Sequence, residues 1–303
     1  MVRLPEYLKR PIIDTETTKN VRRILKTNCL NTVCESARCP NKNECYTKNT
    51  ATFLIMGQVC TRNCRFCNIS TATPLPLDEN EPENIAKAIQ ELGLKYAVIT
   101  SVTRDDLADG GAEHFAKCIE AIRELANTSL REIQTADFKQ QAHRSNLPQV
   151  PKIEILTPDF KNDKNSLDTI IQAHPDVFNH NIETVPRLYK TARPQAIYQR
   201  SLDVLRYVKE NSDIMTKSGI MVGLGETFEE LEQTLKDLKQ IDCDIVTIGQ
   251  YIQPSKAHLS VEKYYNIEEF EQLKALAKKI GLKNYPFGPL VRSSYKAAEV
   301  FSD

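Results

Sequence analysis

The sequence predicts an α/β fold of the partial (β/α)6 TIM type, an open barrel of six parallel strands and the helices between them. From residue 50 onward, short β-rich apolar runs alternate with helical patterns, as in successive β-α units. With 303 residues and 41% apolar content, the chain is long enough for one sizeable domain with a buried core. Six units are too few to close an eight-stranded barrel, so one side is expected to be open.

Six apolar runs are predicted as the strands: residues 52–59, 96–102, 152–157, 177–182, 218–224 and 244–252. In parallel barrels, the groups of the active site lie on loops at the carboxyl ends of the strands. The first of these loops begins at Cys60. We therefore expect the chemistry of this chain to be carried by residues that follow the six runs.

Helices are predicted between the strands. Asn80 and Glu83 form a capping-box pattern, and an apolar stripe from Ile85 to Leu92 ends at Gly93. Further helical patterns cover residues 112–125, 198–210, 227–240 and 267–280. Residues 127–151 are polar and lack an apolar period, which predicts a surface insertion. The basic residues between positions 187 and 209 are interpreted as a solvated face rather than a docking site.

The composition disfavours nucleic-acid and membrane partners. Lys and Arg number 40, as do Asp and Glu, so the formal net charge is zero and no overall field attracts a polyanion. The chain has no run of eighteen apolar residues, and residues 1–10 contain charges and a proline where a signal peptide is apolar. We expect a cytoplasmic protein.

Nine cysteines are present, and six of them lie between Cys34 and Cys67. Without an export signal, such a cluster favours metal or redox chemistry over disulfides. Cys60, Cys64 and Cys67 have C-x3-C-x2-C spacing, so one loop offers three thiolates. Because four-iron clusters normally take four cysteines, three cysteines leave one iron open to a small molecule.

The alternative for this loop is a zinc site, because Cys64 and Cys67 alone form a C-x2-C pair. Zinc sites commonly use two such pairs, and the other cysteines are spaced differently. Upstream, Cys34, Cys39 and Cys45 have C-x4-C-x5-C spacing, which again supplies three ligands and a gap. Two incomplete sets so close in sequence favour iron–sulfur clusters over zinc.

The loop from Cys60 to Cys67 resembles the cluster-binding loop of the radical SAM superfamily. The run that starts at Thr32 and contains ARCPNKNECY and TATFLIMGQVCTRNCRFC further resembles the lipoyl synthase family. Four more stretches resemble that family: residues 100–111, 179–185, 223–226 and 288–295. The match spans residues 30–298, although Gln195 and Phe287 depart from the family pattern.

The resemblance implies that a four-iron cluster on Cys60, Cys64 and Cys67 binds S-adenosylmethionine and cleaves it to a 5′-deoxyadenosyl radical. The residues expected to bind this cosubstrate follow barrel strands: Thr100, Ser101, Asn181, Glu183, Gly223, Gly225 and Glu226. The glycines would let the backbone approach a ligand closely, although a tight turn alone explains a G-x-G sequence. The charged loop 104–111 fits a functional and a structural role equally.

The resemblance also implies an auxiliary four-iron cluster on Cys34, Cys39 and Cys45. A serine of the RSSY motif at 292–295 is its implied fourth ligand. Ser294 is the assigned ligand and Ser293 the close alternative; without the resemblance, the motif is an ordinary polar tail. A hydroxyl is a less usual ligand than a thiolate, which suits a bond that is meant to be lost.

By the same resemblance, the chain inserts sulfur at C6 and C8 of an octanoyl chain amide-linked to a lysine of a carrier protein, and the auxiliary cluster donates both sulfurs. The implied partners are octanoylated lipoyl domains of dehydrogenase complexes, the glycine cleavage H protein, an external electron donor and the iron–sulfur assembly machinery. Such chemistry needs a closed, dry pocket. Residues 1–49 and 283–303 are therefore expected to be extensions that cover the mouth of the barrel, residues 50–282.

Two rival interpretations remain open. Biotin synthases and methylthiotransferases also insert sulfur by radical chemistry, but they carry their auxiliary ligands in the barrel or in a longer N-terminal domain. A non-catalytic iron–sulfur carrier would need neither six β-α units nor the GLGE sequence at 223–226.

Overall fold

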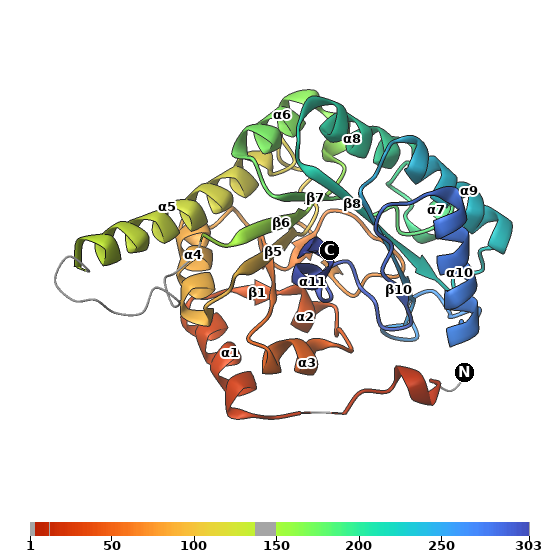
Figure 1. Ribbon diagram of the computed structural model, residues 1–303, viewed down its shortest axis with the longest axis horizontal. Coiled ribbons are helices and arrows are strands. Elements are labelled where there is room, and N and C mark those ends of the chain that lie inside the picture. The colour runs from red at the N-terminus through yellow and green to blue at the C-terminus, as the bar shows by residue number, and fades with distance from the viewer. Residues whose placement is uncertain (1–3, 12, 137–149, 303) are drawn as a thin grey trace.

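The structure is a computed structural model that describes residues 4–11, 13–136 and 150–302 (Figure 1). Its main feature is an eight-stranded sheet in which every neighbouring pair is parallel except β1 with β2. In spatial order the strands are β1 (Asn31–Thr32), β2 (Thr52–Ile55), β5 (Tyr96–Ser101), β6 (Lys152–Leu156), β7 (Val177–Asn179), β8 (Met215–Val222), β9 (Ile245–Gln250) and β10 (Phe287–Gly288). A small second sheet pairs β3 (Val59–Cys60) with β4 (Ser70–Thr71).

The six predicted strands are present as β2 and β5 to β9, and the predicted α/β class is confirmed. Two further strands, β1 and β10, extend the sheet at its edges and belong to the predicted N- and C-terminal extensions. Each is only two residues long, which is too short to show an alternating pattern in the sequence. Among the described strands, β1 and β10 do not pair with each other, so the sheet is open.

Helices lie along the outer face of the sheet, where they form an arc in Figure 1. They are α4 (Glu81–Leu92), α5 (Ala112–Ala136), α6 (Lys164–Ala173), α8 (Tyr198–Asn211), α9 (Phe228–Gln240) and α10 (Ile267–Ile280), with the short α7 (Tyr189–Ala192) before α8. Strand residues Ile99, Ile155 and Ile248 are fully buried, as expected for parallel strands covered on both faces.

The predicted capping box at the start of α4 is wrong. Asn80 has helical φ and ψ values of −88° and −9°, and its side chain caps no amide of the helix. Instead its backbone and side-chain nitrogens both donate to Asp78 Oδ1, at 2.9 and 3.3 Å. A cap residue needs an extended backbone to aim its side chain at the helix amides. The predicted end of α4 is correct, since Gly93 is left-handed with φ of 64°.

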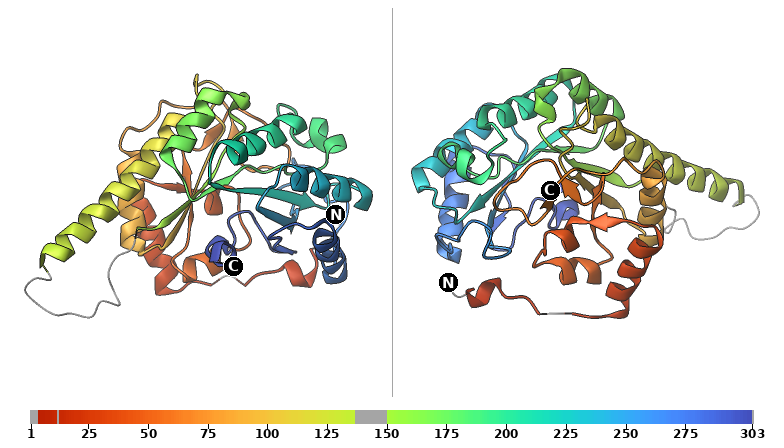
Figure 2. Two further views of the ribbon diagram at one scale, coloured as in Figure 1. Left: turned by 45° about the horizontal axis from the view of Figure 1, so that its top comes forward. Right: turned by 180° about the vertical axis from the view of Figure 1, so that it is seen from behind.

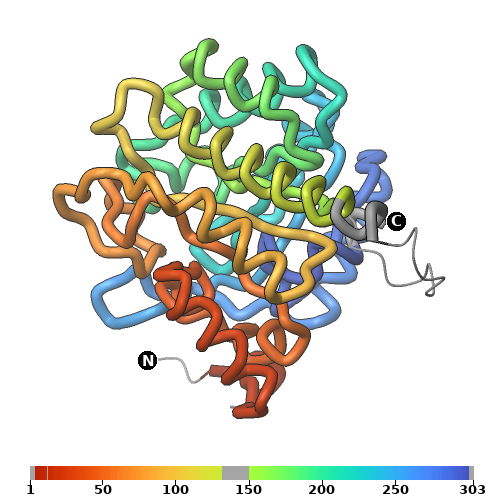
Figure 3. Tube along the Cα trace, turned by 90° about the vertical axis from the view of Figure 1, so that its left-hand side faces the viewer, coloured from red at the N-terminus to blue at the C-terminus, as the bar shows by residue number. Residues whose placement is uncertain are grey.

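Helix α5 continues past its predicted end at residue 125 and reaches Ala136, so the first part of the predicted surface insertion at 127–151 is helical. Thr128 and Ser129 are accommodated within this helix, where they donate their hydroxyls back to Glu124 O and Leu125 O. Residues 137–149 lie outside the described part of the chain. Figure 3 shows α5 running beside α4, against which it packs.

Both ends of the chain lie at the open side of the barrel (Figures 1 and 2). The N-terminal part forms η1 (Glu6–Leu8), α1 (Glu16–Thr27), α2 (Val33–Ser36) and α3 (Lys42–Thr47), while α11 (Ala297–Ser302) lies inside the curve of the sheet beside β5. Asn41 Nδ2 donates to Leu290 O at 2.7 Å, and the Tyr295 hydroxyl donates to Glu44 Oε1 at 2.8 Å. The two extensions therefore contact each other directly.

In the part of the chain that the structure describes, no helix has both the length and the apolar character needed to cross a membrane.

Candidate active site

A cavity of about 390 Å³ lies inside the curve of the sheet. Its wall is formed by strands β2, β6, β8 and β9, by the loop that follows Cys60, and by residues of both extensions. The predicted site residues that line it are Cys34, Cys39, Cys45, Cys67, Asn181, Glu183 and Ser294. The fold therefore brings together predicted residues from three distant parts of the sequence.

The first cysteine loop is held by hydrogen bonds to its own sulfur and to its backbone. Cys60 Sγ accepts the amides of Arg62, at 3.4 Å, and of Thr103, at 3.3 Å. The Asn63 amide donates to Gln195 Oε1 at 3.3 Å, so the residue that departs from the family pattern contacts this loop. These bonds bend the chain around the Cys60 thiol.

The thiols of this loop lie close enough to influence each other's ionisation. Burial, together with the neighbouring Cys64 and Cys60 thiols, raises the pKa of Cys67 to about 12. Burial also raises the pKa of Cys64, while Arg193 opposes the rise. A bound cation would stabilise the thiolate forms that burial disfavours. The loop thus has a donor set that fits an iron–sulfur cluster.

The second cysteine set lies on the N-terminal extension. Cys34 is in α2 and Cys45 is in α3, and between them the Cys39 amide donates to the Cys34 carbonyl at 3.1 Å. Burial, together with the neighbouring thiols, raises the pKa of Cys34 to about 11 and that of Cys45 to about 12. As in the first loop, a bound cluster would stabilise the thiolate forms that burial disfavours. Within the described ranges, no three His, Cys, Asp or Glu side chains are grouped to hold a single metal ion.

The C-terminal segment places two serines in the cavity wall. The Ser293 hydroxyl donates to Asn181 Oδ1 at 2.9 Å. The Ser294 hydroxyl makes no hydrogen bond within the described chain, and it shares the cavity with the N-terminal cysteines. Ser294 is thus the freer of the two hydroxyls to act as a ligand.

Glycines on β8 and β9 make room for this segment. A Cβ on Gly219 would lie 2.6 Å from Asn181 Oδ1 and 2.8 Å from Ser293 Oγ. A Cβ on Gly249 would lie 2.0 Å from the carbonyl oxygen of Val291. A glycine inside a strand often marks a close backbone approach, and here the approaching backbone is the C-terminal segment.

Asn181 and Glu183 follow β7 and lie in the cavity wall. Asn181 Nδ2 donates to Glu183 Oε1 at 3.2 Å, and the Glu183 amide donates to Gly219 O at 2.8 Å. Glu183 has φ of 70°, a strained backbone that is typical of functional sites. Burial raises the pKa of its carboxyl, while Arg193 opposes the rise. A buried carboxylate in this position favours a cationic ligand group.

Thr100 and Ser101, at the end of β5, are not among the residues that line the cavity. The Thr100 hydroxyl donates to Leu156 O at 3.0 Å. The Ser101 hydroxyl is buried and has no hydrogen-bond partner in the described chain. Because buried polar atoms are rarely left unpaired, Ser101 is the better candidate of the two for binding a cosubstrate.

The turn at 223–226 also lies outside the cavity wall. Gly223 and Gly225 have φ values of 101° and 103°, which favour glycine. A Cβ on Gly223 would lie 2.3 Å from Gln250 Nε2, so the close approach at Gly223 is made by protein and not by a ligand. Glu226 accepts the amides of Gly223 and Leu224 at 2.6 and 2.9 Å. A role for these residues toward a cosubstrate stays a prediction.

Sequence analysis missed the position of Arg193, which was interpreted as part of a solvated face. Its side chain is buried, and Nη1 donates to Asn181 O at 3.0 Å and Ile182 O at 3.1 Å. The guanidinium carbon lies 5.4 Å from the centre of the Tyr189 ring. Arg193 thus supports the backbone beside Glu183. The one signal in the sequence was the following proline, which places Arg193 at a helix end.

Two solved structures share this fold at low sequence identity. Streptococcus suis SuiB bound to its precursor peptide SuiA has a TM-score of 0.56 at 12% identity, over 82% of this chain and 52% of that chain. HydG, a maturase of the [FeFe]-hydrogenase, has a TM-score of 0.54 at 12% identity, over 95% of this chain and 60% of that chain. This chain thus spans between half and two thirds of these proteins.

Residues 54–238 match the family model described as Radical SAM superfamily. With the open parallel sheet and the three-cysteine loop after its first barrel strand, the chain belongs to that superfamily.

Curated relatives narrow the assignment. Lipoyl synthase from Caldanaerobacter subterraneus subsp. tengcongensis is 49% identical over 98% of this chain and 96% of its own length. Lipoyl synthase from Caldicellulosiruptor bescii is 50% identical over 97% of this chain and 94% of its own length. Within the superfamily, the chain belongs to the lipoyl synthase family.

Proposed function

We propose that this chain inserts two sulfur atoms, at C6 and C8, into an octanoyl chain amide-linked to a lysine of a carrier protein, and so forms the lipoyl cofactor. The observation that carries the proposal is that Cys67 of the first set lines the same cavity as all three cysteines of the second set. Catalyst and sulfur source can then act on the same acyl chain. The names and full-length similarity of the relatives support the choice of substrate.

Two ligand sets are proposed, one for each four-iron cluster: Cys60, Cys64 and Cys67 for the first, and Cys34, Cys39, Cys45 and Ser294 for the auxiliary one. When bound, the first cluster supplies the electron that cleaves S-adenosylmethionine, and the auxiliary cluster supplies sulfur. The three-thiol loop leaves one iron free for the cosubstrate. The hydroxyl of Ser294 is a weaker ligand than a thiolate, so it can be released.

The cavity wall suits chemistry on an unactivated carbon chain. Apolar side chains line much of it, among them Leu156, Ile220, Met221, Ile252 and Val291. They bind an octanoyl chain by removing its apolar surface from water. They also exclude water and polar groups that would divert a reactive intermediate.

Polar residues at one side of the cavity orient the cosubstrate. Glu183 and Asn181 share the cavity wall with Cys67, and the Glu183 carboxylate is near enough to help raise the pKa of that thiol. The Glu183 carboxylate attracts the amino group of S-adenosylmethionine by charge. Arg193 fixes the backbone that carries both residues, because it donates to the carbonyls of Asn181 and Ile182.

The proposed carriers are octanoylated lipoyl domains of dehydrogenase complexes and the glycine cleavage H protein. An external donor supplies electrons, and the iron–sulfur assembly machinery rebuilds the consumed auxiliary cluster. We place the reaction in the cytoplasm, which suits nine cysteines that are all free thiols. The proposed segments are an N-terminal extension over residues 1–49, a barrel over 50–282 and a C-terminal segment over 283–303.

The test incubates the anaerobically reconstituted full chain with S-adenosylmethionine, dithionite and an octanoyl-lysine peptide. Mass spectrometry should detect 5′-deoxyadenosine, a monothiolated peptide cross-linked to the enzyme, and then the lipoyl product. Iron analysis should give roughly eight atoms per chain, the content of two four-iron clusters. Absence of 5′-deoxyadenosine from a chain loaded with iron would remove the enzyme proposal.

Single cysteine variants separate the two ligand sets. Cys60→Ala should abolish 5′-deoxyadenosine formation, whereas Cys34→Ala should retain it and lose the lipoyl product. Cys29→Ser is the matched control, because Cys29 is exposed and belongs to neither set. Normal lipoyl formation by Cys34→Ala would disprove the assignment of the sulfur source.

A further inference from the structure

Arg62 lies between the first two cysteines of the loop, yet its side chain is only 5% exposed. Its Nε and Nη2 donate to the two carboxylate oxygens of Asp105 at 2.7 and 2.9 Å. Nη2 also donates to Asp159 Oδ1 at 2.6 Å. A planar guanidinium that satisfies two carboxylates in this way has one orientation only. The loop is therefore tied to the ends of β5 and β6.

Asp159 is held by an unusual stretch of backbone. The next three residues, Phe160, Lys161 and Asn162, have φ values of 43°, 53° and 60°. Consecutive left-handed residues other than glycine are strained and persist only where the surroundings enforce them. Here the strained turn directs the fully buried Asp159 carboxylate toward Arg62, and the Lys161 amide donates to the same oxygen at 3.1 Å.

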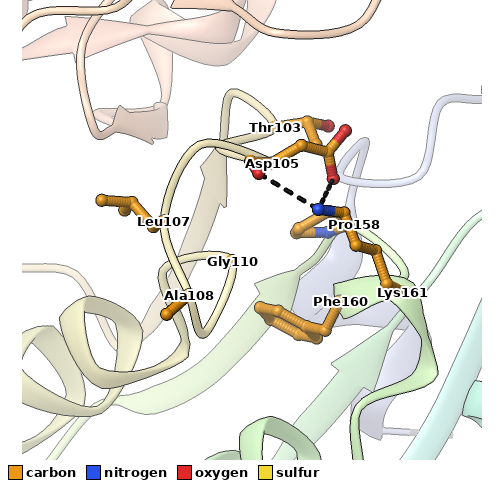
Figure 4. A pocket seen from close by; sticks show the side chains of 8 residues that line it. All are labelled: Thr103, Asp105, Leu107, Ala108, Gly110, Pro158, Phe160 and Lys161. Carbon is orange, nitrogen blue, oxygen red and sulfur yellow. Dashed lines mark hydrogen bonds and ion pairs between the residues drawn. The ribbon is translucent and has the colours of Figure 1, made fainter.

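The strained turn at 160–162 also contacts the charged loop 104–111 that follows β5, as Figure 4 shows. Lys161 Nζ donates to Asp105 O at 3.1 Å and lies 4.0 Å from Asp105 Oδ1. The Phe160 ring packs on Gly110, where a Cβ would lie 3.1 Å from Phe160 Cδ1. The sequence was compatible with either a functional or a structural role for loop 104–111. In the structure, this loop helps to fix Asp105 and Asp159, the partners of Arg62.

The ion pairs of Arg62 with Asp105 and Asp159 are connected, through hydrogen bonds of the neighbouring residues, to the sulfur of Cys60. The Thr61 amide and hydroxyl both donate to Thr103 O at 3.0 Å, and the Asp105 amide donates to Thr61 Oγ1 at 3.0 Å. The amides of Arg62 and Thr103 are consequently aimed at Cys60 Sγ from two sides. Hydrogen bonds to ligating sulfurs are one of the factors that set the reduction potential of an iron–sulfur cluster.

We propose that Arg62 is a positioning residue whose ion pairs with Asp105 and Asp159 hold two backbone amides on the Cys60 sulfur and thereby raise the reduction potential of the cluster at this loop. The inference rests on the proposed role of Cys60 as a cluster ligand. It does not depend on the identity of the acyl substrate.

The test measures the reduction potential of the loop cluster in the reconstituted full chain by electron paramagnetic resonance, without acyl substrate. In Arg62→Gln, loss of the two N–H···S bonds should destabilise the reduced cluster and lower its potential. At a fixed solution potential, we expect a roughly tenfold smaller ratio of reduced to oxidised cluster. This corresponds to a reduction potential lower by about 59 mV for a one-electron couple. Arg65→Gln is the matched control: Arg65 is exposed in the same loop, and its side chain makes no interaction in the described chain.

Asp159→Ala distinguishes an effect of Arg62 on the position of the amides from a direct effect of charge on the reduction potential. Removal of a negative charge by itself would raise the potential, whereas loss of the anchor should lower it, as in Arg62→Gln. Arg62→Lys keeps the charge but cannot form the planar fork, so it should also lower the potential, and it serves if Arg62→Gln does not bind iron. A wild-type potential in these variants, or a higher one in Asp159→Ala, would overturn the inference.

Failure of this proposal is distinguishable from failure of the proposed function. Lipoyl formation is assayed separately with the wild-type chain, and the potential is read without that product. If Cys60→Ala retained the loop cluster with an unchanged signal, the ligand assignment would fall and the inference with it.

Discussion

Side chains from four neighbouring strands meet at Glu154, which is fully buried on β6. Its carboxylate accepts Lys217 Nζ at 3.0 and 2.9 Å, the Tyr96 hydroxyl at 2.7 Å and Asn179 Nδ2 at 2.9 Å. The Lys217 side chain is only 1% exposed. A buried ion pair gives little net stability, but breaking it leaves an uncompensated charge in the core.

Lys217→Met should therefore lower the free energy of unfolding by about 3–5 kcal/mol, measured by urea denaturation. Lys236→Met is the control, because the Lys236 ion pair with Glu232 is exposed, with side chains 51% and 34% accessible. That change should stay within about 1 kcal/mol of wild type. Equal effects of the two substitutions would show that the Glu154 pair does not act as a buried pair.

His180 makes folding sensitive to acid. Its Nδ1 lies 2.9 Å from Thr157 O and its Nε2 3.0 Å from Ser201 Oγ. Burial lowers the pKa of His180 to about 4, aided by Arg193 and opposed by Asp159. The unfolded chain binds this proton near pH 6.5 and the folded chain only near pH 4. Between these values the unfolded state holds more protons, so stability falls as the pH falls.

The loss between pH 6.5 and pH 4 should reach roughly 3 kcal/mol from His180 alone. The free energy of unfolding is measured across this window for wild type and His180→Gln. Glutamine does not titrate, so its slope should be smaller by up to one proton. An identical slope in the two proteins would assign the acid sensitivity to other groups.

At the scale of residues, the proposed cysteine ligands can be recognised in the sequence, but the residues that hold their loops in place cannot. Thiol spacing within one loop is visible directly, because three ligands lie within eight positions of each other. Arg193 and Asp159 act through partners distant in sequence, such as Asn181 and Arg62. The proline after Arg193 marks a helix end but does not predict burial, and the burial of both residues depends on how the loops at the strand ends pack.

At the scale of elements, the predicted helices and strands succeeded where a pattern was long enough to be read. The six core strands and the helix α10 over 267–280 match closely. All six strands end earlier than predicted, by the most at β2, which stops at Ile55, and at β7, which stops at Asn179. There the apolar run continues into loops that line the barrel mouth, and composition alone does not reveal where hydrogen bonding between strands stops.

The starts of helices are also hard to predict from sequence, because the same residue type caps one helix and not another. Asn266 has an extended backbone and forms a full capping box with Glu269, with bonds of 2.8 and 3.0 Å, whereas Asn80 caps nothing. Asn266→Ala should lower the free energy of unfolding by about 1 kcal/mol, measured by urea denaturation. Asn266→Asp should keep the wild-type free energy of unfolding, because aspartate also caps helices. Asn80→Ala is the matched control and should leave the free energy of unfolding unchanged. A loss in Asn80→Ala as large as that in Asn266→Ala would contradict the assignment of the caps.

At the scale of the whole molecule, the open barrel is completed by segments from both ends of the chain. Asn41 of the N-terminal extension bonds to Leu290 O of the C-terminal segment, and both sides contribute to one cavity wall. The sequence predicted that the C-terminus folds back, but only through a family resemblance. The physical cause lies in the sheet, where Gly249 leaves room for the backbone of the C-terminal segment and Gly219 leaves room for its Ser293 side chain.

Gly249 makes this dependence testable. A methyl group at this position would lie 2.0 Å from Val291 O and 3.1 Å from Arg292 Nη1, so the backbone of the C-terminal segment would have to move. Gly249→Ala should therefore lower the free energy of unfolding by about 1–3 kcal/mol and expose residues after 288 to protease. It should also lower the iron retained by the auxiliary cluster, because Ser294 is carried on that segment.

Gly288→Ala provides the control within the same segment. A Cβ there would meet only Val291 Cγ2, at an ordinary 3.4 Å, so the segment should stay docked and protected. The comparison isolates the fit between sheet and C-terminal segment from the general cost of adding a methyl group near the cavity. If Gly249→Ala kept full iron and wild-type resistance to protease, the close approach at β9 would not be what holds the C-terminal segment, and the contacts of Asn41 and Tyr295 would have to suffice.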